Sequence, residues 1–300
     1  MNDKNIPSVA IILVNYNGYK DTAECVESLS RIDYTNRKII IVDNGSTDKS
    51  LDKLRLLENE EIVIINANDN LGFSGGNNVG IQYAIDNGFR YVLLLNNDTV
   101  VKQEFLSELV RTSQENNDSV VVTSKILYEF DRKTIWYAGG AFSEKTSRTS
   151  SRGIGEIDTG KYDNSEEVTF ASGCCMLLPI KVISQIGYMS EDYFLYSEDA
   201  DLCCKIRAHG YRLIYQPNSV IYHKVSASTQ KLNELMTCYI VRNKLILIKK
   251  HIKQKYKLLA YSYITLESLK RAMCGEYTFL SVVNAYKYFC HGQYGKLDMN

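Results

Sequence analysis

The sequence predicts an α/β protein of three layers, in which helices cover both faces of a mostly parallel central sheet. Two observations lead to this prediction. Short apolar segments alternate with segments of helical periodicity from Val9 to Leu127, which is the pattern of β-α-β units around a buried sheet. Polar residues follow several of these apolar segments directly, at the strand ends where such sheets bind ligands.

The first strand is predicted at residues 9–14, a run that is apolar throughout. Asp21-Thr22-Ala23-Glu24 resembles a capping box, so we expect the next helix to start there and to run to about Leu29. Further strands are predicted at 38–43, 61–67, 91–95 and 120–127. Helices are predicted at 74–86, where Gly88 ends the helix, and at 103–115.

Residues 131–170 differ in composition, because Gly, Ser, Thr and charged residues dominate and Trp136 and Tyr137 stand as isolated anchors. We expect a long excursion there, as a hairpin or a flexible loop beside a bound substrate. A strand at 173–179, a helix at 197–209 and strands at 211–215 and 219–223 are predicted to follow. The pattern is helical from Leu232 onward, so we expect an α/β domain over residues 1–230 and a helical extension over residues 231–300.

Charge and apolar patterning limit the partners and the location. Lys plus Arg and Asp plus Glu are balanced at 35 each among 300 residues, which argues against a nucleic-acid partner. The first residues lack an apolar segment of signal-peptide length, and no run approaches the roughly 18 apolar residues of a membrane span. A cytoplasmic location is therefore expected.

The C-terminal helical region carries seven basic residues and no acid between Arg242 and Lys257. An apolar stripe recurs at helical spacing opposite them, at Val241, Leu245, Ile248, Ile252 and Tyr256. Two interpretations stay open. The stripe can lie on an anionic membrane surface, at the inner face of the cell membrane, or it can pack on the α/β domain and leave a solvated basic face.

Two segments after strands have the chemistry of a nucleotide site. Asp43 follows the second predicted strand, where its carboxylate can accept the imide N–H of uracil or thymine or can close an Asx turn. The glycine-rich segment 70–78 precedes a helix, and its backbone N–H groups can bind phosphate. A dinucleotide-binding site is disfavoured because its glycines would directly follow the first strand, where Asn15-Tyr16-Asn17-Gly18 stands instead.

Acidic residues end or start two further elements. Asp98 follows the most apolar strand, where oxygen ligands suit Mg²⁺ or Mn²⁺, although a polar turn would use the same residues. His223 ends a later strand and is either a further ligand or a structural hydrogen-bonding residue. Glu198, Asp199 and Asp201 open a helix, and three acids exceed what helix capping needs. Such separated carboxylates suit an enzyme that holds a metal-bound diphosphate beside a catalytic base.

These segments together resemble an inverting family 2 glycosyltransferase with the GT-A fold. The similar stretches lie at 9–17, 39–48, 70–80, 91–100, 173–179, 194–202 and 219–228, within residues 8 to 230. Asn-Leu-Gly-Phe-Ser-Gly-Gly-Asn-Asn, Asn-Asn-Asp and Ser-Glu-Asp-Ala-Asp-Leu are most similar to the rhamnosyltransferase and galactofuranosyltransferase branch.

The resemblance implies a role for each matching residue. Asp43 would read the pyrimidine base, Asp98 and His223 would hold the metal, and Asp199 would be the general base. The implied nucleotide site also includes Asn15, Asn17, Asn70, Gly72, Phe73, Gly75, Gly76 and Asn78. Supporting or acceptor positions are Asn97, Gly173, Glu198 and Asp201. The chain departs from the family at Asn96-Asn97-Asp98, which offers one carboxylate where many relatives offer two, and His223 can compensate.

We therefore expect a metal-dependent transfer, with Mg²⁺ or Mn²⁺, of a sugar from a nucleotide-sugar to a hydroxyl of a glycan or lipid-linked glycan acceptor in cell-surface polysaccharide synthesis. The expected donor is dTDP-rhamnose, with UDP-galactofuranose or another UDP-hexose as alternatives. Asp199 is expected to stay ionised at neutral pH because the helix dipole favours the anion. An inactive nucleotide-sugar-binding module is the alternative of a different class. A nucleotidyltransferase fits less well, because residues 15–21 lack a glycine-rich loop with a Lys or Arg that could bind phosphate.

Overall fold

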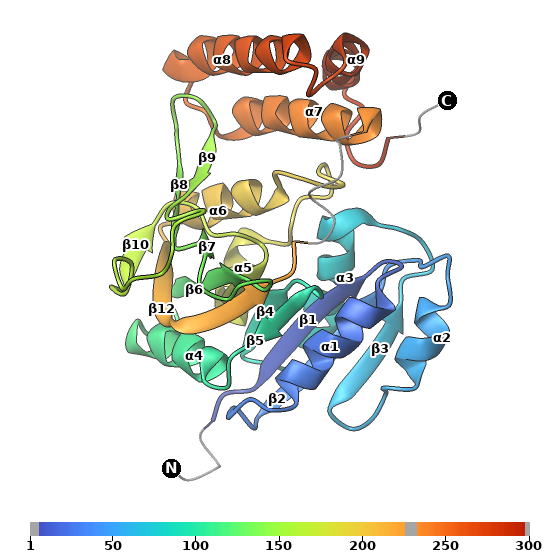
Figure 1. Cartoon of the computed structure of the whole chain (residues 1–300), viewed down its shortest axis with the longest axis vertical. Coiled ribbons are helices and arrows are strands. Elements are labelled where there is room, and N and C mark those ends of the chain that lie inside the picture. Colours follow the sequence, from blue (N-terminus) through green and yellow to red (C-terminus); the bar gives the residue numbers. More distant parts are fainter. Residues whose placement is uncertain (1–5, 226–232, 298–300) are drawn as a thin grey trace.

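The computed structural model describes residues 6–225 and 233–297. Twelve strands lie in these two ranges, and ten of them form one mixed sheet (Figure 1). The strands are β1 (Val9–Asn15), β2 (Arg37–Asp43), β3 (Ile62–Asn66), β4 (Tyr91–Leu95), β5 (Thr99–Val101), β6 (Val120–Tyr128), β7 (Ile135–Tyr137), β8 (Gly140–Phe142), β9 (Thr149–Ser151), β10 (Glu166–Val168), β11 (Cys175–Pro179) and β12 (Arg212–His223).

The helices of the described residues alternate with the strands and then continue alone at the C-terminal end. They are α1 (Tyr19–Leu29), α2 (Ser50–Arg55), α3 (Gly72–Asp86), α4 (Phe105–Glu115), α5 (Ile180–Ile186), α6 (Glu198–Ala208), α7 (Glu234–His251), α8 (Gln254–Met273) and α9 (Phe279–Cys290). Helix α4 packs on β12 and β6, and α6 packs on β12 and α7.

The strand order sets which chain ends meet at one edge of the sheet. The order is β10-β12-β6-β11-β4-β1-β2-β3, with β5 beside β12 and β7 beside β6. Strands β3, β2, β1 and β4 are parallel, β11 runs antiparallel between β4 and β6, and β12 is parallel to β6. The carboxyl ends of β1, β2, β4 and β12 therefore share one edge with the start of β11. The predicted mostly parallel sheet is confirmed.

Helices lie on both faces of β1, which confirms the three-layer prediction. Side chains alternate across a strand, and on one face Thr22 of α1 donates from its hydroxyl to the Asn15 side chain. On the other face, Gly76 of α3 lies so close to Val14 that an added Cβ would come within 2.8 Å of its methyl group, and Gly80 lies equally close to Ile12. The glycines thus let α3 pack tightly on the sheet.

Several predicted boundaries are wrong. Helix α1 begins at Tyr19, and its N-cap residue, Gly18, offers no side-chain cap in the described structure. The capping box does not form there because Asp21 pairs with Lys224 instead. Helix α2 was not predicted. The two strands predicted at 211–215 and 219–223 are one strand, β12, whose register on β6 shifts between Gln216 and Val220.

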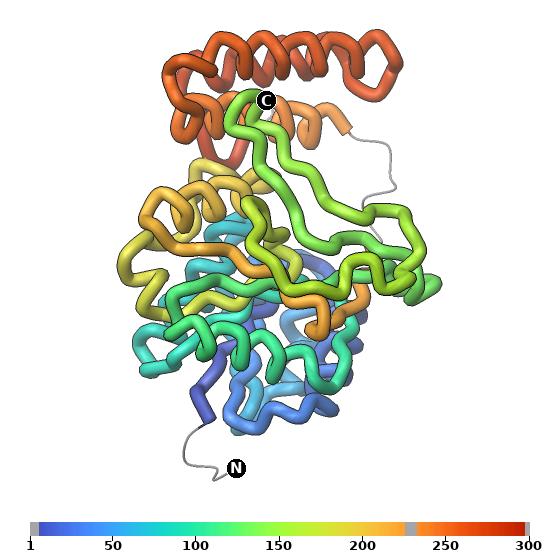
Figure 2. The backbone as a smooth tube through the Cα atoms, turned by 90° about the vertical axis from the view of Figure 1, so that its left-hand side faces the viewer, coloured from blue at the N-terminus to red at the C-terminus, as the bar shows by residue number. Residues whose placement is uncertain are grey.

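The predicted excursion at 131–170 contains the hairpin β8–β9, so the hairpin interpretation is confirmed. Figure 2 shows this hairpin extending from the sheet toward the C-terminal helices. Its tip contacts them through the ion pair between Glu144 and Lys253, 3.1 Å long. Trp136 does not anchor a free loop, because its ring packs edge-on against His223.

The C-terminal stripe predicted at 241–256 is divided by a helix end at His251. Val241, Leu245, Ile248 and Ile252 are at most 3% exposed. These four side chains are covered by the protein, so the packed interpretation of the stripe holds and a membrane cannot reach it. The predicted domain boundary at residues 230 and 231 lies outside the described residues. Within the described ranges, no helix combines the length and apolarity needed to cross a bilayer.

The start of α3 yields a stability prediction. Gly72 has φ +71°, and an added Cβ would lie 2.2 Å from the carbonyl oxygen of Phe194. We expect Gly72→Ala to lower the free energy of unfolding by about 2 kcal/mol or more, through backbone strain and this clash. Gly88→Ala is the matched control, because Gly88 has φ +69° with open space around it, and it should cost only about 1 kcal/mol. Denaturant titration of both variants tests the difference; equal losses would contradict it.

Candidate functional site

The site lies at the edge where the carboxyl ends of β1, β2, β4 and β12 meet. The backbone N–H of Asn96 donates to the carbonyl of Cys174 (2.9 Å), and the neighbouring N–H of Gly173 donates to Asp199 (3.3 Å). The segment at the start of β11 therefore places two carboxylates at the same edge of the sheet. They are Asp98, just after β4, and Asp199, at the start of α6.

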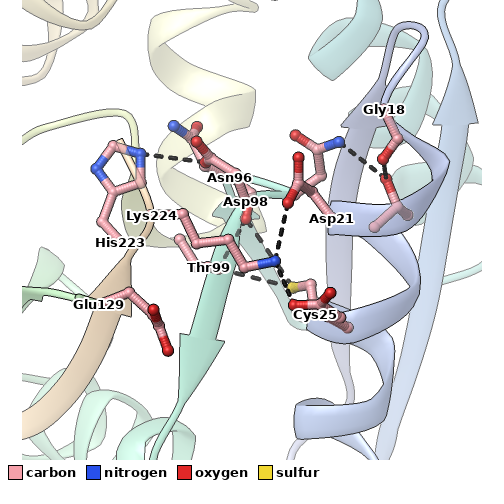
Figure 3. Close-up of polar contacts among 12 residues, drawn as sticks. Gly18, Asp21, Cys25, Asn96, Asp98, Thr99, Glu129, His223 and Lys224 are labelled. Carbon is pink, nitrogen blue, oxygen red and sulfur yellow. Dashed lines mark hydrogen bonds and ion pairs between the residues drawn. The ribbon is translucent and has the colours of Figure 1, made fainter. Parts of the chain in front are cut away.

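Asp98 and His223 face each other across two strand ends (Figure 3). The Asp98 Oδ1 and His223 Nε2 atoms are 3.1 Å apart, and the rings of His223 and Trp136 lie 4.6 Å apart at 82°. The other ring nitrogen, Nδ1, is buried and has no hydrogen-bond partner among the described residues. The structure thus brings Asp98 and His223 together through the Nε2 atom of the histidine.

Lys224 lies directly beside this pair and was not singled out from the sequence. Its ammonium group binds Asp21 at 2.8 Å and Glu24 at 2.5 Å on α1 (Figure 3). Burial alone would lower the pKa of Lys224, but the hydrogen bonds and charges of the two carboxylates raise it above its ordinary value. Lys224 therefore remains a cation and fixes the end of β12 to α1. No sequence signal relates it to residues some 200 positions away.

Asp199 is held by two backbone N–H groups. Gly173 donates to one carboxylate oxygen at 3.3 Å and Ala200 to the other at 2.8 Å. A larger residue would fit tightly at Gly173, because an added Cβ would lie 3.3 Å from the Phe73 ring and 3.4 Å from the Asp199 Cβ. Burial raises the pKa of Asp199 above its ordinary value, and the two N–H donors oppose that rise.

Glu198 is the buried partner of Asp199. It is 8% exposed, and in the described structure its Oε2 atom is buried without a hydrogen-bond partner. Burial first, and then the charge of Asp199, raise the pKa of Glu198 to about 8. At neutral pH Glu198 therefore holds a proton, and its carboxyl adds no negative charge beside Asp199. The expectation that the helix dipole keeps Asp199 ionised stays a prediction, and burial opposes it by raising the pKa of Asp199.

The segment before Glu198 has a strained backbone and is held by hydrogen bonds from α7. Tyr196 and Ser197 both have left-handed backbones, with φ of 72° and 71°, which non-glycine residues rarely adopt. The Asn243 side-chain amide on α7 donates to the carbonyls of Leu195 and Tyr196, each at 2.8 Å. Asn243 in turn accepts from the guanidinium of the fully buried Arg242 at 3.0 and 2.8 Å. The sequence placed Arg242 in a basic face and gave no signal for Asn243.

Asp201 does not join the other two acids. It lies on a different side of α6, is 0% exposed, and meets His251 of α7 at 2.7 Å. Burial alone would raise the pKa of Asp201, but the hydrogen bond with His251 and the nearby charges of His251, Lys205 and Lys250 lower it below its ordinary value. Asp201 supports the site indirectly by joining α6 to α7, and it does not face an acceptor.

Asp43 and Asn15 form a closed polar cluster at the ends of β2 and β1. Both are 0% exposed. Asn15 donates to Asp43 at 2.9 Å, and Ser46 donates to Asp43 from its backbone N–H at 3.0 Å and its hydroxyl at 2.6 Å. The backbone bond joins Asp43 to the N–H three residues on, one residue farther than in the Asx turn of the alternative interpretation, and holds Asp43 within its own turn. Contact between Asp43 and a base stays a prediction that requires the turn to open toward a bound nucleotide.

Asn17 and Asn70 hold the neighbouring loops. The Asn17 side chain accepts from the backbone N–H groups of Thr47 at 2.8 Å and Asp48 at 3.2 Å. Asn70 accepts from the Gly72 N–H at 2.9 Å, and it also accepts from Asn44 at 3.2 Å. Asn44 was not singled out from the sequence, although it bridges the turn after β2 to the start of α3.

The glycine-rich segment is helical from Gly72 onward, so it is not a free phosphate loop. The Phe73 N–H donates to the Phe194 carbonyl at 2.9 Å. Gly75 and Gly76 face Leu71 and Val14 at distances that leave no room for a side chain. Asn78 exchanges two hydrogen bonds with the backbone of Met189, both 3.0 Å long. These residues position α3, and their contact with a nucleotide stays a prediction. Asn97 likewise donates to Thr22 at 2.8 Å.

The fit of a divalent metal rests on the Asp98–His223 pair. One carboxylate and one imidazole converge there, with the Nε2 atom of His223 facing the Asp98 carboxylate. No cluster of three or more His, Cys, Asp or Glu side chains that could hold a metal occurs within 6–225 and 233–297. Mg²⁺ is commonly bound by only one or two protein ligands, with water and substrate phosphates completing its shell. The residues present therefore suit a metal that is shared with a diphosphate.

Comparison with known sequences identifies the family. A family model described as Glycosyl transferase family 2 matches residues 10–187. The chain is 32% identical over 205 residues to the low-salt glycan biosynthesis hexosyltransferase Agl10 of Haloferax volcanii, covering 67% of this chain and 62% of that protein. It is 24% identical over 226 residues to the poly-beta-1,6-N-acetyl-D-glucosamine synthase of Staphylococcus aureus, covering 72% of this chain and 50% of the synthase. The chain spans between half and two thirds of these relatives.

Solved structures of other proteins have a similar fold. The structure of GalNAc-T7 with UDP, GalNAc and Mn²⁺ superposes with a TM-score of 0.65 at 15% identity, over 97% of this chain and 59% of that one. The Pyrobaculum calidifontis mannosyltransferase PcManGT, in complex with GDP-Man and Mn²⁺, gives 0.60 at 14% identity, over 98% of this chain and 77% of that one. These likenesses confirm the predicted GT-A fold.

The Glu198–Asp199 pair yields a pH prediction. Glu198 has an ordinary pKa near 4.5 when unfolded and about 8 when folded. The folded state thus holds this proton more tightly, and the resulting stability is full below pH 4.5 and is lost as pH rises toward 8. Glu198→Gln lacks this loss, so its free energy of unfolding relative to the parent should increase between pH 5 and 8. Denaturant titrations across this range measure it, with the exposed Glu60→Gln as control. Parallel curves for Glu198→Gln and the parent would exclude the raised pKa.

Proposed function

Since the chain belongs to glycosyl transferase family 2, we propose that it transfers a sugar from a nucleotide-sugar donor to a hydroxyl group of a glycan or lipid-linked glycan, with inversion at the anomeric carbon. The observation that carries this proposal is the position of Asp199. This carboxylate accepts hydrogen bonds from two backbone N–H groups and lies at the same sheet edge as the Asp98–His223 pair. The relatives named as a hexosyltransferase and a polysaccharide synthase support a role in glycan synthesis.

Asp199 is proposed as the general base. It accepts the proton of the acceptor hydroxyl as the hydroxyl oxygen forms its bond to the anomeric carbon and the bond to the nucleoside diphosphate breaks. Such proton transfer contributes about 10²–10⁴ in rate. The N–H groups of Gly173 and Ala200 fix the carboxylate, and a protonated Glu198 places no second negative charge beside it at neutral pH. Single displacement needs no enzyme nucleophile.

Asp98 and His223 are proposed to hold Mg²⁺ or Mn²⁺. A divalent ion bound there would act as a Lewis acid that neutralises the charge of the departing diphosphate. Their closeness at 3.1 Å supports the shared site, as do the GT-A structures that contain Mn²⁺. Lys224 would keep the His223 strand end in place through Asp21 and Glu24.

The proposed donor is dTDP-rhamnose, with UDP-galactofuranose or another UDP-hexose as alternatives. The support is the likeness of residues 70–78, 96–98 and 197–202 to the rhamnosyltransferase and galactofuranosyltransferase branch. The proposed nucleotide site comprises the ends of β1 and β2 with the start of α3. A thermal-shift screen of these nucleotide-sugars with Mn²⁺ tests the donor, because a ligand at about 100 times its dissociation constant stabilises the folded state by about 2.7 kcal/mol.

The alternative of a different class is an inactive nucleotide-sugar-binding module. It is favoured by the closed hydrogen-bond cluster around Asp43, which leaves no base contact without rearrangement. The orientation of Asp199 by Gly173 opposes it, because a binding module has no need of an aimed carboxylate. Metal-dependent hydrolysis or transfer of the donor sugar would exclude the inactive module.

The first functional prediction concerns Asp199→Asn. The amide keeps the shape and removes the base, so we expect turnover to fall at least about 10²-fold while donor binding stays nearly unchanged. Asp201→Asn is the control, because Asp201 binds His251 and faces away from the site. It should instead lower thermal stability, by about 1.5–3 kcal/mol for a lost charged hydrogen bond, and keep most of the turnover. If Asp201→Asn were inactive and Asp199→Asn were active, the general base would be Asp201 and not Asp199.

The second functional prediction concerns the metal. Excess chelator should abolish transfer, and either Asp98→Ala or His223→Ala should weaken metal-dependent binding of the nucleoside diphosphate at least about tenfold, because each removes one of two protein ligands. Titration of the nucleotide with and without Mn²⁺ measures this. Thr99→Ser, which keeps the neighbouring hydroxyl, is the control. Transfer that continues undiminished in chelator would leave Asp98 as a turn residue.

A further inference from the structure

Helices α8 and α9, which lie farthest from the sheet, expose many large apolar side chains. On α8, Leu258, Leu266 and Met273 are 81%, 67% and 79% exposed, and on α9, Phe279 and Leu280 are 56% and 58% exposed. Soluble proteins seldom expose a contiguous apolar patch of this kind, and such patches mark binding surfaces for proteins or membranes. We call the exposed residues 258–283 of α8 and α9, with the groove between these helices, the outer apolar face.

Helix α8 is apolar on two sides. Its inner side, Ala260, Ile264, Ser268 and Ala272, is buried in the protein. Leu259, Leu266, Leu269 and Met273 recur at intervals of seven, three and four on another side, and all four are at least 38% exposed. A helix that packs on one neighbour needs only one apolar stripe. In the described structure this second stripe is open to solvent.

The outer apolar face is continuous across the two helices. Leu269 of α8 and Val282, Val283 and Tyr286 of α9 line one groove between them. The hydroxyls of Thr265 and Tyr286 are hydrogen-bonded at 2.6 Å across the same junction, which fixes the two helices side by side. The face is therefore a preformed surface and not a pair of independent stripes.

The charges on these helices are basic. Lys255, Lys257, Lys270 and Lys287 form no ion pair within the described ranges of the chain. The two acids of α8 and the turn after it are neutralised, since Glu267 pairs with Lys244 at 3.0 Å and Glu276 with Arg271 at 3.3 Å. An apolar stripe bordered by unpaired lysines is the composition of helices that lie in the headgroup region of an anionic membrane.

We propose that the outer apolar face of α8 and α9 binds the surface of an anionic membrane. A second copy of the chain is a poorer occupant, because a two-fold contact would bring the same lysines of both copies together.

In Figure 1, α7 lies between the sheet and α8, with α8 and α9 outermost. Asn243 of α7 also contacts the segment before Glu198. The candidate site and the outer apolar face thus flank α7. The proposal does not depend on sugar transfer.

The test is co-sedimentation of the full chain with vesicles of phosphatidylcholine alone or of equimolar phosphatidylcholine and phosphatidylglycerol. We expect binding only to the anionic vesicles, and a strong decrease in high salt. The double variant Leu266→Glu/Met273→Glu should bind at least about tenfold more weakly. Both side chains are exposed, so folding should be preserved. Leu56→Glu is the matched control, since Leu56 is 83% exposed after α2.

A second pair of variants isolates the charge. Lys270→Glu/Lys287→Glu should abolish the preference for anionic vesicles, whereas Lys20→Glu/Lys102→Glu, which reverses two exposed lysines elsewhere, should retain it. Equal sedimentation with both vesicle types, or unchanged binding by Leu266→Glu/Met273→Glu, would overturn the proposal. So would a concentration-dependent dimer in analytical ultracentrifugation that Leu266→Glu/Met273→Glu dissociates, because the occupant would then be a second copy. The readout is binding, so an enzyme without transferase activity would leave it intact.

Discussion

The site depends on the strained segment between Phe194 and Ser197. Two consecutive left-handed residues there cost free energy that surrounding contacts must offset. Helix α3 holds one end, through the Phe73 N–H and the absence of a side chain at Gly72. Helix α7 holds the other, through the two hydrogen bonds of Asn243. Because Glu198 and Asp199 follow at once, the direction of the proposed base is set by contacts from both the α/β core and the C-terminal helices.

Burial and pairing give the three acids of α6 different charge states. Burial and then the charge of Asp199 raise the pKa of Glu198 to about 8, so Glu198 keeps a proton at neutral pH. Asp199 accepts hydrogen bonds from two backbone N–H groups, which oppose the rise that burial causes in its pKa. Asp201 is fully buried as well, but His251 and two lysines hold its pKa below the ordinary value. One acidic run of sequence thus supplies a neutral acid, a proposed base and a structural ion pair, each set by the groups that tertiary packing brings to it.

The C-terminal helices have two separate tasks in this structure. Their inner surfaces carry Asn243 and His251, which bind the segment around α6, and Arg242, which donates to Asn243. Their outer surfaces carry the outer apolar face, which exposes Leu258, Leu266 and Met273 to solvent and is bordered by lysines. The basic patterning around residue 250 therefore does not belong to one amphipathic helix. It is divided between lysines that stabilise the protein, such as Lys250 beside Asp192 at 2.7 Å, and lysines that remain available to a partner.

The sequence by itself determined the α/β class, the buried strands and the polar residues at their ends, because apolar runs and their periodicity are local and β-α-β order dictates a common edge. Local pattern could not assign partners. Asp21 looked like a cap and binds Lys224, Gly76 looked like part of a phosphate loop and lets α3 approach β1, and Asp201 looked like part of the site and binds His251. Asn243 carried no sequence signal at all. Each of these outcomes joins residues dozens to hundreds of positions apart, and only tertiary packing decides which of the available donors, acceptors and voids a side chain meets.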